Sequence, residues 1–456
     1  MEIDTGNTAW VLASAALVLL MTPGLAFFYG GMVRSKNVLG MLMQNFACMA
    51  VVGVLWVLFV YSIAFGADAG NGLFGDLHQW GLRNIKEPVA GYDGALAQSI
   101  PPIVFVAFQL MFAIITPALM TGSIADRVKF GAFVLFVGLW IALVYGPIAH
   151  WVFSPEGWLF QRGALDFAGG TVVHANAGAA GLAMCLVLGR RLGWPKEQMR
   201  PHNVPFVLLG AGLLWFGWFG FNAGSALGAN ALAGQAFFTT MVATATALLG
   251  WLIVERIRDG HYTSLGAASG AVAGLVAITP ACAFVTPIGA VGLGLVAGAV
   301  CSLAVGLKWK LGFDDSLDVV GVHLVGGLIG ALLTGVFAST AINTVAGGPA
   351  QLGKQAIAAA VTLVFSFVAT LAILKVVDSL VGVRVTEEEE EEGLDLSQHG
   401  ESAYGHGEPS TAVPALTEND IDRLVKELMK AARTGTEDDG AVVIPSMQRS
   451  EGAPID

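Results

Sequence analysis

The sequence has few charged side chains. Asp, Glu, Lys and Arg make up only 12% of its 456 residues, against about 25% in a typical soluble domain. The mean hydropathy is +0.69. This composition excludes an ordinary soluble globular protein, and the formal net charge of -11 gives no reason to expect a nucleic-acid partner.

Several chemical signatures are also missing. The four cysteines are scattered without a CxxC pair, so we expect inert buried thiols and no disulfide. No HExxH motif is present, and we expect neither a metal nor a cofactor. The first residues, MEIDTGNTAW, lack the positive charge of a signal peptide, so we expect the first helix to be retained.

Apolar runs of roughly 20 residues, enough to cross a bilayer, recur along the chain. The fold class that they predict is an all-α polytopic membrane protein with eleven transmembrane helices. The predicted spans are 9–32, 40–65, 101–124, 130–153, 167–189, 204–225, 235–255, 264–282, 287–307, 317–338 and 355–380.

The basic residues predict the orientation of these spans. Fourteen Lys and Arg residues fall in one set of loops and at the C-terminal end, and only four fall in the alternate loops. Basic loops stay in the cytoplasm, so the N-terminus is predicted outside and the C-terminus inside. We therefore expect a multi-pass protein of the cell inner (plasma) membrane.

Two histidines interrupt the apolar runs at equivalent places in the two halves of the chain. His174 follows Asp166 by eight residues in the fifth span, and His323 follows Asp315 by eight residues in the tenth. Five spans per half make the second half run upside down, which predicts an inverted 5+5 repeat plus a last helix. Both histidines then lie near the middle of the membrane, because eight residues rise about 12 Å.

The sequence allows three interpretations of the histidine pair. The two side chains could simply be packed and hydrogen-bonded, or they could ligate a metal. A metal would need a third ligand, and the nearest acids, Asp166 and Asp315, are two turns away. The third interpretation is a path for a small neutral hydride such as ammonia, or for a proton passed between rings, because each neutral imidazole offers one donor and one acceptor.

Several motifs carry a resemblance to a known family. They are PGLAFFYGGMVRSKNVL near the start, DFAGGTVVHANAG, WFGFNAGSA, ITPACAFV, DDSLDVVGVHLVGG and the tail EEEEEEGLDLSQHGESAY. From about Thr8 to Tyr404 the chain closely resembles the Amt/Rh ammonium transporters, and the bacterial Amt branch fits better than the Rh branch. The resemblance implies a transmembrane domain over residues 1–384 that conducts ammonia, with methylammonium as an analogue.

The resemblance also implies roles for individual residues. His174 and His323 are the twin pore histidines. The other implied positions are Asp166, Phe112 and Ser225 at the outer recruitment site, Phe112 and Phe221 as the two gate rings, and Phe108 and Trp218 along the pore.

One position departs from the family pattern. The family commonly reads HxVWG after the fourth span, with the tryptophan forming a wall of the outer site, whereas this sequence reads HWVFSPEG. Phe153 takes that place, and Phe holds a cation more weakly than Trp. Trp151, two residues earlier, is an alternative outer-site aromatic.

The acidic segment 385–456 is predicted to be a cytoplasmic C-terminal tail. The simplest interpretation is a solvated segment of consecutive charged residues without a specific role. The resemblance implies instead that the tail docks under neighbouring subunits of a homotrimer and communicates with a PII-type signal protein. Thr417 and Asp420 begin a possible short amphipathic helix at 418–433.

Three functions remain open from the sequence. The first is an ammonium transporter, electrogenic or acting as a passive gas channel. The second is an ammonium sensor that signals through its tail with little flux. The third is an intramembrane metalloenzyme. The histidine pair favours transport, whereas Phe153 and the extra tail leave room for sensing.

Overall fold

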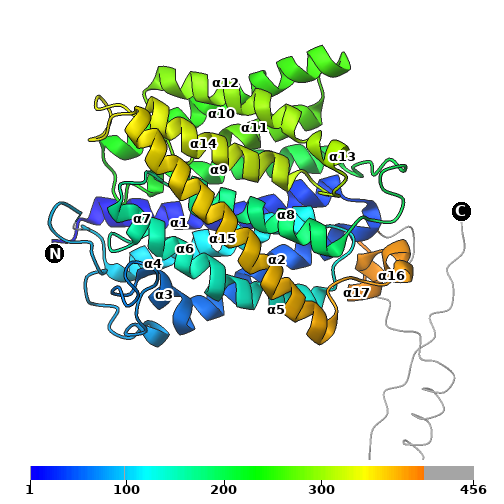
Figure 1. Ribbon diagram of the computed structural model, residues 1–456, viewed down its shortest axis with the longest axis horizontal. Helices are drawn as coiled ribbons and strands as arrows, with labels where there is room; N and C mark the ends of the chain where they lie inside the picture. The colour runs from blue at the N-terminus through cyan, green and yellow to red at the C-terminus, as the bar shows by residue number, and fades with distance from the viewer. Residues whose placement is uncertain (1, 97, 405–456) are drawn as a thin grey trace, which may run out of the picture. The chain divides into compact units, whose positions relative to one another are not determined.

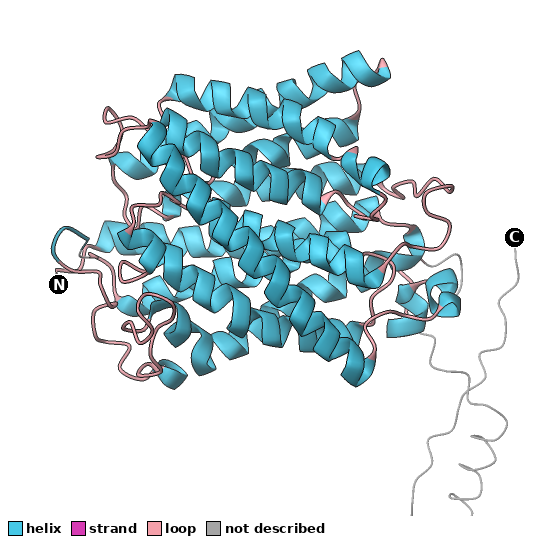
Figure 2. Ribbon diagram, viewed as in Figure 1, coloured by secondary structure: helices cyan, strands magenta, loops and turns pink. Residues whose placement is uncertain are grey.

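The computed structural model describes residues 2–96 and 98–404, and these residues form helices joined by loops, without an extended strand (Figure 2). The long helices are α1 (Thr5–Met32), α2 (Val38–Leu55), α4 (Pro102–Met120), α5 (Phe130–Trp140), α8 (Asn176–Leu188), α9 (Val204–Gly224), α10 (Ala231–Asp259), α11 (Ser264–Ile278), α12 (Pro287–Ala304), α14 (Val325–Phe337) and α15 (Pro349–Val381). The shorter α-helices are α3 (Tyr61–Phe65), α6 (Gly146–Phe153), α7 (Trp158–Gln161), α13 (Leu307–Leu311), α16 (Glu387–Glu392) and α17 (Leu394–His399).

Four segments inside the long helical rods are π-helices: η2 (Trp56–Val60), η6 (Ile141–Tyr145), η7 (Gly170–Ala175) and η8 (Val320–Leu324). Short 3₁₀ turns complete the set: η1 (Ser35–Asn37), η3 (Trp80–Leu82), η4 (Gly94–Leu96) and η5 (Thr121–Ser123). Both predicted pore histidines fall in π-helices, which recur at functional sites because they widen the helix locally.

Ten helical segments within the described residues are long and apolar enough to cross a membrane. This confirms the predicted all-α polytopic membrane architecture. The predicted count of eleven depends on α11, which has only 15 residues, and it stays a prediction together with the orientation. The predicted span 264–282 is longer than α11 because Pro280 offers no amide hydrogen to continue the helix beyond Ile278.

The two ends of the described chain lie at opposite ends of the bundle. Figure 1 shows the N-terminus at one end and α16 and α17 at the other. An odd number of crossings gives this arrangement. We use "outer" for the end that holds the N-terminus and "inner" for the end that holds α16 and α17, in line with the predicted orientation.

A buried ionic cluster fastens the inner end. Arg127 is fully buried, and its Nη1 lies 2.9 Å from Oδ2 of Asp314. Arg191 Nε donates to the same carboxylate oxygen at 2.9 Å. These residues belong to loops that are far apart in sequence, so the cluster holds the inner ends of several helices together.

The described part of the acidic tail packs against this inner end. Thr386 and Glu389 form a capping box that starts α16. Glu390 accepts from Arg384 at 2.9 Å, and Asp395 Oδ1 accepts from the amide of Gly40 at 2.8 Å. The compact unit thus extends to Tyr404, beyond the residue 384 at which the sequence analysis ends the transmembrane domain. The predicted helix at 418–433 lies outside the described residues.

Candidate functional site

Asp166 anchors the N-terminal end of η7. Its Oδ1 accepts from the amides of Gly169 and Gly170 at 2.8 and 2.7 Å, and its Oδ2 accepts from Thr171 and Val172 at 2.8 and 3.1 Å. The first amides of a helix have no partners of their own, and a carboxylate satisfies them well. Asp166 therefore fixes the start of the segment that carries His174.

The second half of the chain repeats this arrangement. Asp315 accepts from the amides of Val319 and Val320 at 3.1 and 2.7 Å, at the start of η8, which carries His323. The two segments run in opposite directions. Asp166, before η7, and Asn343, after α14, both line a cavity at the outer end, so η7–α8 leaves that cavity and η8–α14 approaches it.

Glycines let the two segments touch. A Cβ on Gly178 would lie 2.3 Å from the amide nitrogen of Leu324, and a Cβ on Gly327 would lie 2.8 Å from the amide nitrogen of Ala175. Any larger residue at these positions would push the two π-helices apart. The close approach brings the two histidines within reach of each other.

His174 and His323 lie side by side in the buried interior. Their Nδ1 atoms are 3.4 Å apart, and their rings are stacked with centroids 5.5 Å apart. Their exposed fractions are 1% and 2%. Two neutral rings that share an Nδ1 to Nδ1 hydrogen bond must be different tautomers: one donates there and keeps Nε2 as an acceptor, and the other carries its hydrogen on Nε2.

Aromatic rings continue the line from the histidines toward the outer end. Trp218 stacks on His174 with centroids 5.2 Å apart, and its indole nitrogen donates to the hydroxyl of Thr279 at 2.8 Å. Phe221 stacks on Phe112 at 4.2 Å with an interplanar angle of 25°. Phe108 meets the edge of Phe112 at 5.0 Å. Phe112 lines the outer cavity described below, and Phe221 also lies 6.0 Å from the His174 ring, so the two buried phenylalanines lie between that cavity and the histidine pair.

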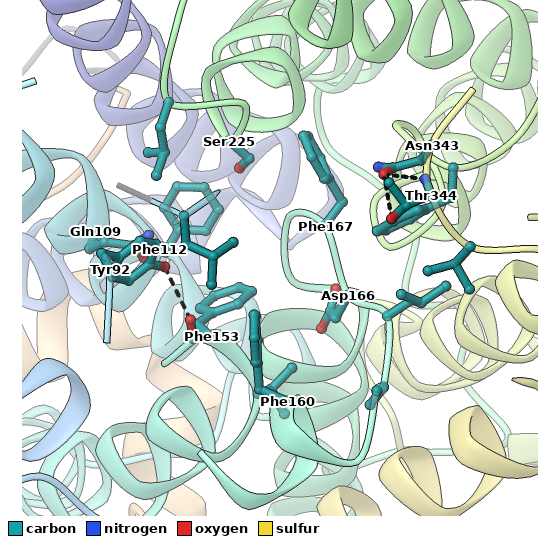
Figure 3. A pocket seen from close by; sticks show the side chains of 18 residues that line it. Tyr92, Gln109, Phe112, Phe153, Phe160, Asp166, Phe167, Ser225, Asn343 and Thr344 are labelled. Carbon is teal, nitrogen blue, oxygen red and sulfur yellow. Dashed lines mark hydrogen bonds between the residues drawn. The ribbon is translucent and has the colours of Figure 1, made fainter. Parts of the chain in front are cut away.

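A cavity of about 440 Å³ lies on the outer side of these two rings. Figure 3 shows Asp166 and Ser225 on its wall, with the Phe112 and Phe153 rings close together. Ser225 donates to the carbonyl of Phe221 at 2.8 Å, which leaves its oxygen lone pairs free to accept a hydrogen bond. The structure thus brings Asp166, Phe112, Phe153 and Ser225 to one cavity.

The two candidate aromatics around the fourth span are placed differently. Phe153 lines the cavity, and its ring meets the edge of Phe112 at 6.3 Å. Trp151 does not line the cavity; its indole donates to the carbonyl of Leu73 at 2.7 Å, and its ring packs on Phe365. The expected substitution of Trp151 for an outer-site tryptophan therefore receives no support from this geometry.

The sequence analysis missed three residues at the site. Tyr92, in the loop before α4, donates to the carbonyl of Phe153 at 3.1 Å. Gln109 lines the outer cavity, and its buried Oε1 has no hydrogen-bond partner within the described residues. Gln109 could have been noticed as a polar residue in the apolar run FQLMF, and Thr279 as the hydroxyl of ITPACAFV. Nothing local marks Tyr92, because its role depends on the path of a long loop.

A metal site is not built from the residues that the structure describes. Within residues 2–96 and 98–404 no three His, Cys, Asp or Glu side chains gather as a ligand set. The recorded ring neighbours of His174 are Trp218, Phe221 and His323, none of which is a carboxylate or a thiol.

Comparison with known proteins assigns the chain to a family. The model of the "Ammonium Transporter Family" matches residues 9–404. An ammonium transporter of Mycobacterium tuberculosis is 54% identical to this chain over 93% of its length and 96% of that protein.

Solved structures of similar proteins support the same family assignment. The crystal structure of Saccharomyces cerevisiae Mep2 superimposes with a TM-score of 0.80 at 36% identity, covering 85% of this chain and 89% of that one. A structure titled "Sensor Amt Protein" gives a TM-score of 0.80 at 30% identity, covering 86% of this chain and 98% of that one. The chain is therefore a multi-pass protein of the plasma membrane rather than an enzyme, and it belongs to the ammonium transporter family.

Proposed function

We propose that this chain recruits ammonium at the outer cavity, removes its proton, and conducts ammonia inward along the histidine pair. The observation that carries the proposal is the line of contacts from the outer cavity through Phe112 and Phe221 to His174 and His323. These contacts join only aromatic rings and the two imidazoles, without an Asp, Glu, Lys or Arg side chain.

The outer cavity attracts the cation in this mechanism. Faces of Phe112 and Phe153 contribute cation–π attraction of about 0.5–2 kcal/mol, and the Ser225 oxygen accepts an ammonium N–H. Because the four amides bonded to Asp166 already occupy its carboxylate oxygens, the residue holds the wall and lends negative potential without binding the ion too tightly.

The stacked phenylalanines then select ammonia over cations. A bare cation between two apolar rings loses its hydration and gains no ligand, which is very costly. Ammonium can release its proton, either to water in the outer cavity or to the histidine pair for relay, and continue as ammonia, whereas potassium has no proton to release. Beyond the rings, the complementary tautomers of His174 and His323 offer one donor and one acceptor to ammonia, and their shared Nδ1 contact also permits a relayed proton.

The test is a current measurement on a solid-supported membrane with the purified protein in liposomes. We expect a saturable current after an ammonium pulse, lost in His174→Ala and kept in His261→Ala, which changes a histidine in the loop after α10. Internal alkalinisation by stopped-flow without current would mean a passive gas channel and would remove the proton relay from the mechanism. Absence of both would contradict transport.

A second candidate function is sensing. It is favoured by the structural neighbour titled "Sensor Amt Protein" and by the docking of α16 and α17 on the inner end. Ammonium binding that shifts the tail without any flux would support this function over transport.

We also propose a homotrimer and a PII-type partner at the inner face. The support is family membership and, for the partner, the acidic α16 beside the inner helix ends, on which Glu387, Glu388, Glu391 and Glu392 are exposed. Mass determination of the purified protein and co-purification with and without residues 385–404 test these two proposals separately.

A further inference from the structure

A buried histidine lies close to the outer cavity without lining it. His150 belongs to α6, three residues before Phe153, and its side chain is fully buried. Its Nδ1 lies 3.1 Å from the carbonyl oxygen of Ala64, and its Nε2 lies 3.5 Å from Oδ1 of Asp68. Both ring nitrogens therefore face oxygen atoms that accept hydrogen bonds.

This arrangement fits a protonated ring better than a neutral one. A carbonyl oxygen can only accept a hydrogen bond, so Nδ1 of His150 carries a hydrogen. A neutral ring would then turn a bare lone pair at Nε2 toward the carboxylate of Asp68, and Nε2 has no hydrogen-bond partner within the described residues. A protonated ring instead presents an N–H to Asp68 and forms an ion pair with it.

The charged groups that face His150 are both acidic. Asp68 follows α3, and Glu156 lies on the turn after α6, where its Oε2 accepts from the amide of Asp68 at 2.7 Å. Burial raises the pKa of the Asp68 carboxyl, but the amide bonds from Gly72 and Gly70 and then the His150 ring outweigh burial and hold that pKa below its usual value. Asp68 is therefore ionised from about pH 5 to 8, and protonation of His150 completes the ion pair.

The pair is open to the outer solution on one side only. The side chain of Asp68 is 29% exposed, whereas that of His150 is fully buried. Figure 1 places α3 and α6 toward the end of the bundle that holds the N-terminus, which is the outer end. Water at Asp68 can therefore exchange a proton with Nε2 of His150, and the proton comes from the outer side.

The pair also joins the loop after α3 to the segment that carries Phe153. Beyond α6, the amide of Trp158 donates to the carbonyl of Gly72 at 3.2 Å, so the loop contacts the chain on both sides of Phe153. The turn after Phe153 folds back tightly, since a Cβ on Gly157 would lie 1.9 Å from the carbonyl oxygen of His150. A shift of His150 is thereby passed to Phe153, which lines the outer cavity.

We propose that His150 is a proton-dependent positioning residue of the outer cavity. The protonated ring pairs with Asp68 and holds Phe153 in its place on the cavity wall. The neutral ring repels that carboxylate, so the end of α6 moves away from the loop, and the cavity should hold ammonium more tightly at acid pH than at alkaline pH. The proposal rests on the proposed function in one respect, that ammonium uses this cavity, whereas the protonation of His150 does not depend on transport.

The experiment makes two measurements on the full chain from about pH 5 to 8, the range in which histidines change charge. Nitrogen NMR of protein labelled at histidine follows the protonation of each ring, and His150→Gln identifies the signal of His150. Ammonium-evoked current in liposomes, at equal pH on both sides, gives the half-saturating ammonium concentration. We expect the His150 ring to titrate within this range and the half-saturating concentration to rise roughly three-fold as the ring loses its proton.

Three variants separate the pair from its surroundings. Asp68→Asn keeps the oxygen that the loop amides bind and removes only the charge, so the titration of His150 should move to lower pH by about one unit or more. His150→Gln has no titratable group and should lose the pH dependence of the half-saturating concentration. His78→Gln is the matched control and should change neither measurement, because His78 lies 3.6 Å from Glu87 in the same outer loop but is exposed.

A His150 ring that keeps one protonation state from about pH 5 to 8 overturns the proposal. An equal pH dependence of the half-saturating concentration in the wild type and in His150→Gln also contradicts it, as does a pH dependence confined to the maximal current. If His150→Gln does not fold, an unchanged His150 titration in Asp68→Asn refutes the ion pair.

Failure of the proposed function gives a different result. A chain without ammonium current at any pH contradicts transport but leaves the NMR titration interpretable. Calorimetric titration with ammonium chloride over the same pH range then tests the positioning role of His150. An ammonium affinity that is the same at every pH would reject that role.

Discussion

The substitution Asp166→Asn tests whether the Asp166 carboxylate anchors the backbone of η7 or binds the ammonium ion directly. The aspartate accepts four backbone hydrogen bonds, two on each oxygen. Asparagine keeps one acceptor oxygen and turns an amide group toward the other two N–H donors. Two charge-assisted hydrogen bonds are lost, each worth about 1.5–3 kcal/mol, so a destabilisation of at least about 3 kcal/mol is expected.

The assay is the thermal unfolding midpoint of the purified protein, compared with Asp315→Asn. Asp315 accepts only two backbone hydrogen bonds, and only one of them would be lost. We therefore expect Asp166→Asn to lower the midpoint more than Asp315→Asn does. Transport by the variant that remains folded should fall in maximal current, because η7 and His174 lose their anchor.

One result would refute this reasoning. If Asp166→Asn unfolds at the wild-type temperature and only raises the half-saturating ammonium concentration, the carboxylate is a direct ligand of the ion. The backbone hydrogen bonds would then contribute little net stability, against the assignment of Asp166 as the anchor of η7.

Three further changes have defined outcomes. Phe153→Trp should lower the half-saturating ammonium concentration by a few-fold in the current assay, because Trp adds about 0.5–1 kcal/mol of cation–π attraction; an increase would mean that the larger ring blocks the cavity. Tyr92→Phe removes the hydroxyl that fixes the carbonyl of Phe153 and should raise the same constant by a few-fold, with the exposed Tyr262→Phe as control. Asp314→Asn leaves buried Arg127 without its charged partner and should cost about 3–5 kcal/mol, measured as a lower unfolding midpoint. Burial raises the pKa of the Asp314 carboxyl, but the hydrogen bonds from Arg191 and the charge of Arg127 outweigh burial and hold that pKa below its usual value. The stabilisation from Asp314 should therefore be constant from about pH 5 to 8. It should be lost only as the pH falls through the lowered pKa.

The spans were predictable because hydrocarbon imposes a single simple requirement, a long apolar helix, on every crossing. The equal spacing from Asp166 to His174 and from Asp315 to His323 also pointed to two histidines at the middle of the bundle, and the structure places them in contact. Both observations depend on residues close together in the sequence, in a setting where polar groups are rare.

Other features could not be predicted from local pattern. The π-helices η7 and η8 have the composition of ordinary α-helices, so the sequence did not predict their wider turns. The choice between Phe153 and Trp151 depends on which side of α6 faces the cavity, and an aromatic stretch such as HWVF does not fix that side. Tyr92 contacts Phe153 across a separation of 61 residues, beyond any periodicity.

Both halves of the chain use an aspartate to bind the first amides of the π-helix that carries the histidine, but the number of hydrogen bonds differs. The outer segment is fixed by four hydrogen bonds to Asp166, and the inner segment by two to Asp315. Asp315 follows Asp314, which accepts from Arg191 in the ionic cluster. The tail contacts the residue next to Arg191, because Arg384 donates to the carbonyl of Arg190 and to Glu390 of α16. Arg384 also donates to the carbonyl of Leu188 at the inner end of α8. A displacement of the tail would therefore act close to the anchor of η8, whereas it would reach His174 only through the length of α8. If the tail controls the pore, we expect it to displace His323, while the outer cavity and its affinity for ammonium stay unchanged.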